Sequence, residues 1–118
     1  MENYNEIFRK RTKVFALNII KLYGSWPNRP EIWVMGKQLL KSSTSVAANY
    51  RASNRARSQA ERYSKLCIVV EEADETAFWL EMFRDSGLVK IEPLQPLLRE
   101  AIELTKVMAA YRNKLKGS

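Results

Sequence analysis

The chain has 118 residues with 20 Lys or Arg and 13 Asp or Glu, a net charge of +7, and a hydrophobic share of 46% that argues against intrinsic disorder. A chain of this length fits one domain, residues 1–118, and its four Gly and four Pro are few for a turn-rich all-β fold. The N-terminus lacks a signal-peptide core, no run of about 18 apolar residues occurs, and the single cysteine cannot form an internal disulfide, so we expect a cytoplasmic protein.

The first helix is predicted over residues 5–23. Its apolar residues recur at nearly helical spacing: Ile7, Phe8, Val14, Phe15, Leu17, Ile19 and Leu22. Gly24 is expected to end this helix, since glycine is favoured just past a helix C-terminus. The segment that follows, residues 24–30, cannot continue the helix because its prolines lack the backbone N–H.

The second helix is predicted to begin at Pro30 and Glu31, a proline in the first turn followed by an acid at the positive end of the helix dipole. Its apolar face consists of Ile32, Met35, Leu39, Val46 and Tyr50, widened by Leu40 and Ala47. Residues 42–45, all Ser or Thr, leave two interpretations open. Their small hydroxyls permit close helix approach or bond back to carbonyls, or the run faces solvent. A break is predicted over residues 52–57.

The third helix is predicted to begin after Ser58, which forms a capping box with Glu61. Its core positions step by three and four residues: Tyr63, Leu66, Val70, Ala73, Ala77 and Leu80. It should end near residues 85–87, with Gly87 as the terminating residue. Cys67 lies in the apolar run 66–70, so we expect a buried, structural thiol.

The fourth helix is predicted from about Pro93 to about Lys116. Its apolar surface comprises Leu94, Leu97, Leu98, Ile102, Leu104, Val107 and Met108. Short connections between long helices favour antiparallel neighbours. The predicted fold is therefore all-α, an antiparallel up-down-up-down four-helix bundle.

The residue types present argue against an enzyme. The chain has no histidine, which excludes His-based acid–base catalysis and the Ser-His-Asp arrangement, and it has no phosphate-cradling glycine motif. We expect no catalytic residue, no cofactor and no metal site. The acidic cluster Glu71, Glu72, Asp74 and Glu75 would make only a weak site for a hard cation. Pairing of Glu72 or Glu75 with a neighbouring helix, for example at Lys41, is the favoured interpretation.

The basic residues are the more informative feature. Residues 1–65 hold 13 basic and 4 acidic side chains (+9), whereas residues 66–118 hold 7 and 9 (−2). One cluster lies around the second break and comprises Arg51, Arg55, Arg57, Arg62 and Lys65; the other, on the first helix, comprises Arg9, Lys10, Arg11 and Lys13. Antiparallel packing would join them into one positive surface that binds nucleic-acid phosphates. The alternatives are an anionic membrane surface, docking of an acidic protein, and an ordinary solvated surface.

Aromatic residues suggest a second surface. Phe78 and Trp79 are adjacent, so they cannot both face the same core, and one of them or Met82 should point outward. An outward apolar stripe usually marks a partner surface, and self-association is the simplest case. The alternative is that one long side chain lies along a groove.

Several segments resemble the four-helix bundle proteins called 23S rRNA intervening-sequence proteins. The segment Gln38–Ala52 resembles their signature, as do Ala56–Ser58 with Glu61 and the Lys65–Leu66 pair. The segment Glu71–Leu80 is similar to the third-helix motif of that family, and Phe15–Leu17 also fits.

The resemblance implies a small bacterial protein of a family that has no settled biochemical function. Some members are encoded within insertions in 23S rRNA genes. Their relatives include the accessory variability determinant of diversity-generating retroelements, a basic pentameric ring that binds nucleic acid and a reverse transcriptase. The resemblance therefore implies a homopentamer, with RNA or DNA and a protein such as a reverse transcriptase or a regulator as expected partners. The lack of a long apolar run separately predicts no membrane partner.

Overall fold

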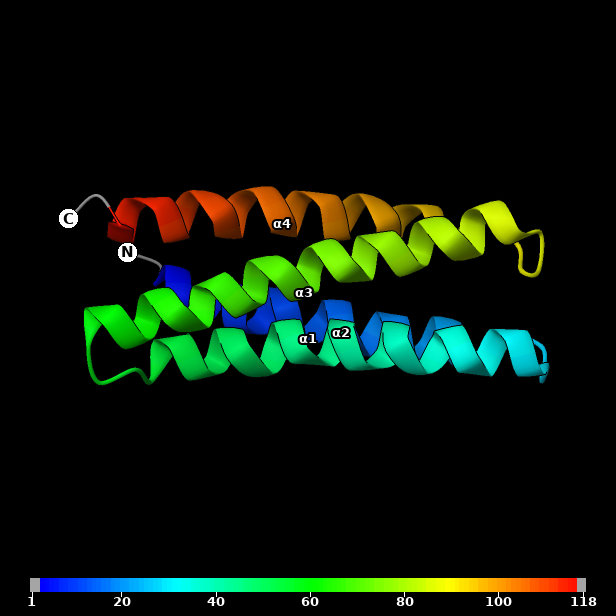
Figure 1. Ribbon diagram of the computed structural model, residues 1–118, viewed down its shortest axis with the longest axis horizontal. Helices are drawn as coiled ribbons and strands as arrows, with labels where there is room; N and C mark the ends of the chain where they lie inside the picture. The colour runs from blue at the N-terminus through cyan, green and yellow to red at the C-terminus, as the bar shows by residue number, and fades with distance from the viewer. Residues whose placement is uncertain (1–2, 117–118) are drawn as a thin grey trace.

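Four helices form the part of the chain that the computed structural model describes, residues 3–116, which contains no strand. They are α1 (Tyr4–Gly24), α2 (Pro30–Asn54), α3 (Gln59–Ser86) and α4 (Gln95–Lys116). The helices lie side by side along the long axis of a molecule that measures 46 × 25 × 19 Å (Figure 1). The predicted all-α class and the four predicted helices are confirmed. Within residues 3–116, none of these helices combines the length and the hydropathy that a membrane span requires.

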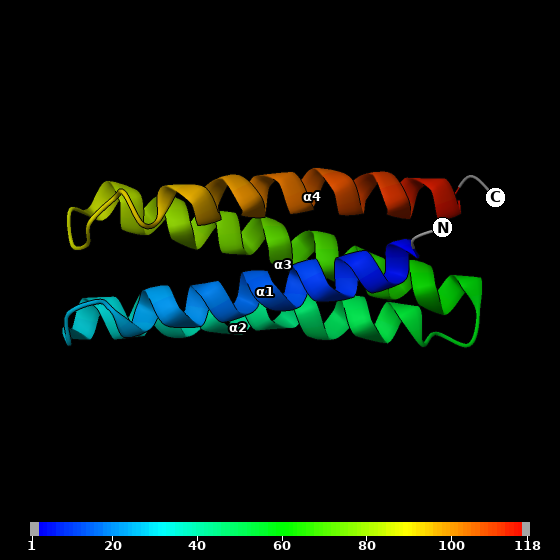
Figure 2. The same ribbon diagram turned by 180° about the vertical axis from the view of Figure 1, so that it is seen from behind.

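Contacts at the helix ends place α1 antiparallel to α2 and α3 antiparallel to α4. Near the start of α1, Arg9 donates a hydrogen bond of 3.3 Å to the side chain of Asn54, the last residue of α2. At the start of α3, Gln59 donates a hydrogen bond of 3.2 Å to the carbonyl of Leu115, near the end of α4. The connecting loops accordingly lie at alternate ends of the molecule (Figures 1 and 2). Segments that are distant in sequence therefore share an end of the bundle.

The core runs the length of the bundle and is built largely from the predicted apolar faces. It includes Phe15, Ile19, Leu39, Leu80 and Leu104, each no more than 2% exposed. Three residues expected in the apolar faces are instead exposed: Val14 (46%), Leu17 (45%) and Ile102 (39%). In the same helices, small residues take the buried positions next to them: Thr12 and Ala16 in α1, and Ala101 in α4. Thr12 is tolerated there since its hydroxyl donates to the Phe8 carbonyl at 2.7 Å.

Three helix boundaries differ from the prediction. Helix α1 includes Gly24, which was expected to lie just past its end, and Ser25 is the C-cap. Helix α2 continues through the predicted break to Asn54, because the buried Ser53 hydroxyl donates to the Tyr50 carbonyl at 2.6 Å and does not interrupt the helix. Helix α4 begins at Gln95, two residues later than predicted, since residues before it form a turn on the Ile91 carbonyl. The predicted start of α3 is confirmed, because Ser58 accepts a hydrogen bond from the Glu61 N–H at 3.0 Å.

The hydroxyl run in α2 serves both of the roles that the sequence left open. Ser42 and Ser43 are fully buried and donate to carbonyls one turn earlier, whereas Thr44 is exposed. The Ser42 hydroxyl also accepts a hydrogen bond of 2.9 Å from Thr76 of α3. The small side chains thus allow α2 and α3 to approach closely, and the buried polar atoms are satisfied.

Helix α3 also presents apolar side chains to solvent. Phe78 is 49% exposed and Met82 is 42% exposed, whereas Trp79 is half-buried against the core. The predicted outward orientation of one of these residues is confirmed. Cys67 is half-buried on the same helix, so it is less enclosed than expected.

Candidate functional site

A groove of about 930 Å³ lies between α1 and α2 and joins the two predicted basic clusters. It is lined by Glu6, Arg9, Lys10, Lys13, Thr44, Ala47, Ala48, Arg51 and Arg55. Spacings of three and four residues place the α1 cations on one helix face and the α2 cations on another. Antiparallel packing then sets the start of α1 beside the end of α2. The structure therefore brings five of the nine predicted binding residues into one groove, hereafter the basic groove.

The five cations of the basic groove are all exposed. Within residues 3–116, none of them forms an ion pair, and Glu6 is the one acidic residue among the lining side chains. Arg9 is anchored at its rim by the hydrogen bond to Asn54. On the α2 side the small residues Thr44, Ala47 and Ala48 leave the groove open. A concave surface with five positive charges and one negative charge attracts a polyanion.

Three other predicted residues lie outside the basic groove. The Arg57 side chain, in the loop between α2 and α3, is 92% exposed and lies 4.0 Å from the Glu61 carboxylate. Arg62 is half-buried and donates a hydrogen bond of 3.0 Å to Asn5, while its buried Nε has no hydrogen-bond partner among residues 3–116. Lys65 is half-buried on α3. Arg62 thus helps to join α3 to the start of α1, whereas Arg57 remains available to solvent.

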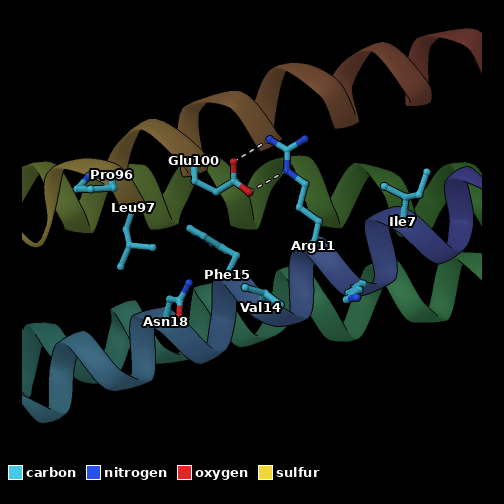
Figure 3. A pocket seen from close by; sticks show the side chains of 9 residues that line it. Ile7, Arg11, Val14, Phe15, Asn18, Pro96, Leu97 and Glu100 are labelled. Atoms are coloured by element: carbon cyan, nitrogen blue, oxygen red, sulfur yellow. Dashed lines mark hydrogen bonds and ion pairs between the residues drawn. The ribbon is translucent and has the colours of Figure 1, made fainter.

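Arg11 points to the opposite side of α1, toward α4 (Figure 3). Its guanidinium group donates two hydrogen bonds to the Glu100 carboxylate, at 2.8 and 2.7 Å, and lies 3.2 Å from Glu103. These interactions, with the Glu100 hydrogen bonds as the main cause, raise the pKa of Arg11 above its ordinary value. Arg11 was predicted to contribute to the basic surface, but its guanidinium is occupied within the bundle.

The Arg11–Glu100 pair spans a second groove, of about 430 Å³, between α1 and α4. Ile7, Val14, Phe15 and Leu97 give this groove a largely apolar lining (Figure 3). Helices α1 and α4 pack less closely against each other than the other neighbouring helices do. The ion pair is therefore a main link across the most open side of the bundle.

The acidic cluster of α3 does not form the predicted ion pair with Lys41. No Lys41 contact within 4.0 Å joins it to Glu72 or Glu75. Burial, and then the nearby Glu75, raise the pKa of Glu72, and the positive charge of Lys41 lowers it only in part. Among residues 3–116, no group of three or more His, Cys, Asp or Glu side chains is arranged to hold a metal ion.

Two features of these grooves are not among the predictions from the sequence. The small residues of the basic groove recur at helical spacing in α2, and this recurrence could have predicted an open helix face. Glu100 and Glu103 are three residues apart on α4, which marks an acidic helix face able to take an arginine from a neighbour. Neither pattern identifies which helix lies beside that face, because the choice of neighbour depends on how the helices pack.

Comparisons with known proteins assign the chain to a family. A crystal structure from Bacteroides thetaiotaomicron, described as a protein of unknown function from the S23 ribosomal protein family, superposes with a TM-score of 0.81 and 32% sequence identity. The match covers 88% of this chain and 96% of that chain. No curated protein shows significant similarity. Residues 5–110 match the family described as 23S rRNA-intervening sequence protein. The chain therefore belongs to the 23S rRNA-intervening sequence protein family.

Proposed function

We propose that the protein is a non-enzymatic, homo-oligomeric accessory protein of the cytoplasm that binds RNA or DNA through the basic groove. The observation that carries this proposal is the set of five exposed cations around one groove, free of ion pairs within the described residues. Arginine binds phosphate bidentately and lysine acts as a mobile point charge, so the groove suits a phosphate backbone. No base-reading geometry is needed for such binding.

Self-association would strengthen binding by this surface. We propose that up-down-up-down bundles assemble into a ring of five, as the family resemblance implies. Each added copy contributes one more basic groove, and linked grooves bind a polyanion more tightly than one groove alone. The exposed Phe78 and Met82 support the existence of a contact between copies.

Salt dependence of binding tests the proposal directly. Labelled RNA and DNA oligonucleotides, single-stranded and duplex, would be titrated with the protein by fluorescence anisotropy between 50 and 200 mM salt. Each phosphate contact releases counterions and contributes about 0.7–0.9 to the slope of log affinity against log salt. Five groove cations therefore predict a slope of about −4 for each engaged copy. Absence of binding at the lowest salt would refute nucleic-acid binding.

A pair of charge-matched variants locates the binding surface. Lys13→Gln/Arg51→Gln removes two cations of the basic groove, and Arg99→Gln/Lys106→Gln removes two exposed cations of α4. We expect the groove variant to reduce the salt slope by about 1.5–2 and the affinity at least tenfold, since two phosphate contacts are lost. The α4 variant should change both values much less. Equal losses in the two variants would show that only net charge matters.

Docking of an acidic protein is the alternative function for the same groove. A carboxylate-rich partner, such as a regulator or the reverse transcriptase suggested by the retroelement relatives, would make similar contacts with arginine and lysine. Pull-down from lysate with and without nuclease separates the two proposals. Partners retained after nuclease treatment, together with salt-insensitive nucleic-acid binding, would favour the protein partner.

A further inference from the structure

Two strips of exposed apolar side chains lie on different faces of the bundle, and the charged residues beside them have opposite signs. The α1/α2 strip consists of Leu17, Ile20 and Trp33, which are 45%, 45% and 40% exposed. It extends the face that forms the basic groove, because Ile20 follows Lys13 by seven residues, or about two helical turns. The α3 strip consists of Phe78 and Met82, which are 49% and 42% exposed. Both strips expose large apolar side chains that a partner would remove from water.

The charges around the two strips are complementary. Exposed lysines lie beside the α1/α2 strip: Lys21, next to Ile20, and Lys37, one turn after Trp33. The Lys37 ammonium lies 5.2 Å from the centre of the Trp33 ring, so this positive charge is held at the strip itself. Exposed acids lie one turn from the α3 strip at Asp74, Glu75 and Glu81, whereas Asp85 is paired with Arg84 at 2.9 Å. Contact between two α3 strips would oppose acids to acids, and contact between two α1/α2 strips would oppose lysines to lysines.

The strips also lie at the same height along the bundle. The hydrogen bond between Ser42 and Thr76 places these two residues at one level of α2 and α3. Gly36 of α2 lies against the Tyr23 ring, which places the end of α1 beside the first turns of α2. Counting along the helices from these two contacts sets Phe78 at the level of Ile20, within about one turn. A neighbouring copy can thus present one strip to the other without sliding along the helix axis.

We infer that the α3 strip of one copy docks on the α1/α2 strip of a second copy of this chain. The contact is heterologous, since it uses two different surfaces, and each copy can therefore use both. The apolar side chains are buried against each other, and the lysines meet the acids around them. This inference rests on the homo-oligomer in the proposed function, and it leaves the α1-start end of the basic groove open to phosphate.

Single substitutions test each strip. Phe78→Asp places a negative charge within the α3 strip, and Ile20→Asp places one within the α1/α2 strip. Both sites are exposed, so the fold should persist, as circular dichroism at 222 nm would show, and Leu17→Asp is a second variant of the α1/α2 strip. In sedimentation velocity, we expect the wild type to associate and each variant to sediment as a monomer. The control Val14→Asp, at a residue 46% exposed on the α1/α4 side, should associate like the wild type.

Mixing the variants gives the decisive result. A heterologous contact predicts that Phe78→Asp and Ile20→Asp, each monomeric alone, form a one-to-one dimer when mixed, because each retains the strip that the other has lost. A mixture that remains monomeric, a monomeric wild type, or dissociation by Val14→Asp would overturn the inference. Oligonucleotide binding by the folded monomers tests the basic groove separately, so failure of the contact and failure of nucleic-acid binding are distinguishable.

Discussion

Removal of Arg11 should weaken the fold and leave the basic groove intact. Its guanidinium donates two hydrogen bonds to Glu100, and the two side chains are 29% and 26% exposed. Hydrogen bonds to charged groups contribute about 1.5–3 kcal/mol, whereas exposed ion pairs contribute about 0–1 kcal/mol. Because this pair is partly buried, we expect Arg11→Gln to lower the free energy of unfolding by an amount between these limits, about 1–2 kcal/mol. For a chain of this length the melting temperature should fall by roughly 3–8 °C.

Urea unfolding followed by circular dichroism measures this loss, and oligonucleotide anisotropy measures binding on the same samples. A double-mutant cycle with Glu100→Gln should give a coupling energy of about 1 kcal/mol, because the two residues act through one contact. Arg51→Gln is the matched control, since it should reduce affinity and leave the unfolding free energy within about 0.5 kcal/mol. The reasoning is refuted if Arg11→Gln weakens binding as much as Arg51→Gln does while unfolding stays unchanged.

Three further substitutions test the packing and the electrostatics of the bundle by urea unfolding. Gly36→Ala should destabilise by about 1–2 kcal/mol, because the added methyl group would overlap the Tyr23 ring, whereas Gly24→Ala, which meets no atom within 4 Å, should not; equal effects would contradict this contact. Ser58→Ala should cost about 1 kcal/mol by removing the N-cap of α3, and an unchanged value would show that the cap is dispensable. Burial raises the pKa of Glu72, so the folded chain binds a proton at this carboxyl more tightly than the unfolded chain does. The free energy of unfolding therefore falls as pH rises from the unfolded-state pKa of Glu72 to its folded-state pKa. Glu72→Gln should therefore stabilise at pH 7, by less than about 1 kcal/mol, and this gain should vanish at pH 3.

Local signals in the sequence located the helices well. The Ser58 cap and the left-handed Gly87, with φ of 75°, act within one turn, so their effect does not depend on distant residues. Ser53 shows the limit of such signals. Its hydroxyl can end a helix or bond back within one, and burial against the neighbouring helices selected the second outcome.

The helical class, the four segments, most of the core and the excess of positive charge in the first half can all be predicted from the sequence. The role of each arginine depends on how the helices pack. Arg11 and Arg9 are two residues apart in α1, yet the helical rotation between them turns Arg11 toward Glu100 and leaves Arg9 at the basic groove. Each residue type has a fixed charge, whereas its freedom to bind a ligand depends on which helix packs beside it. That choice is made by contacts between residues far apart in the chain, such as the 89-residue separation of Arg11 and Glu100.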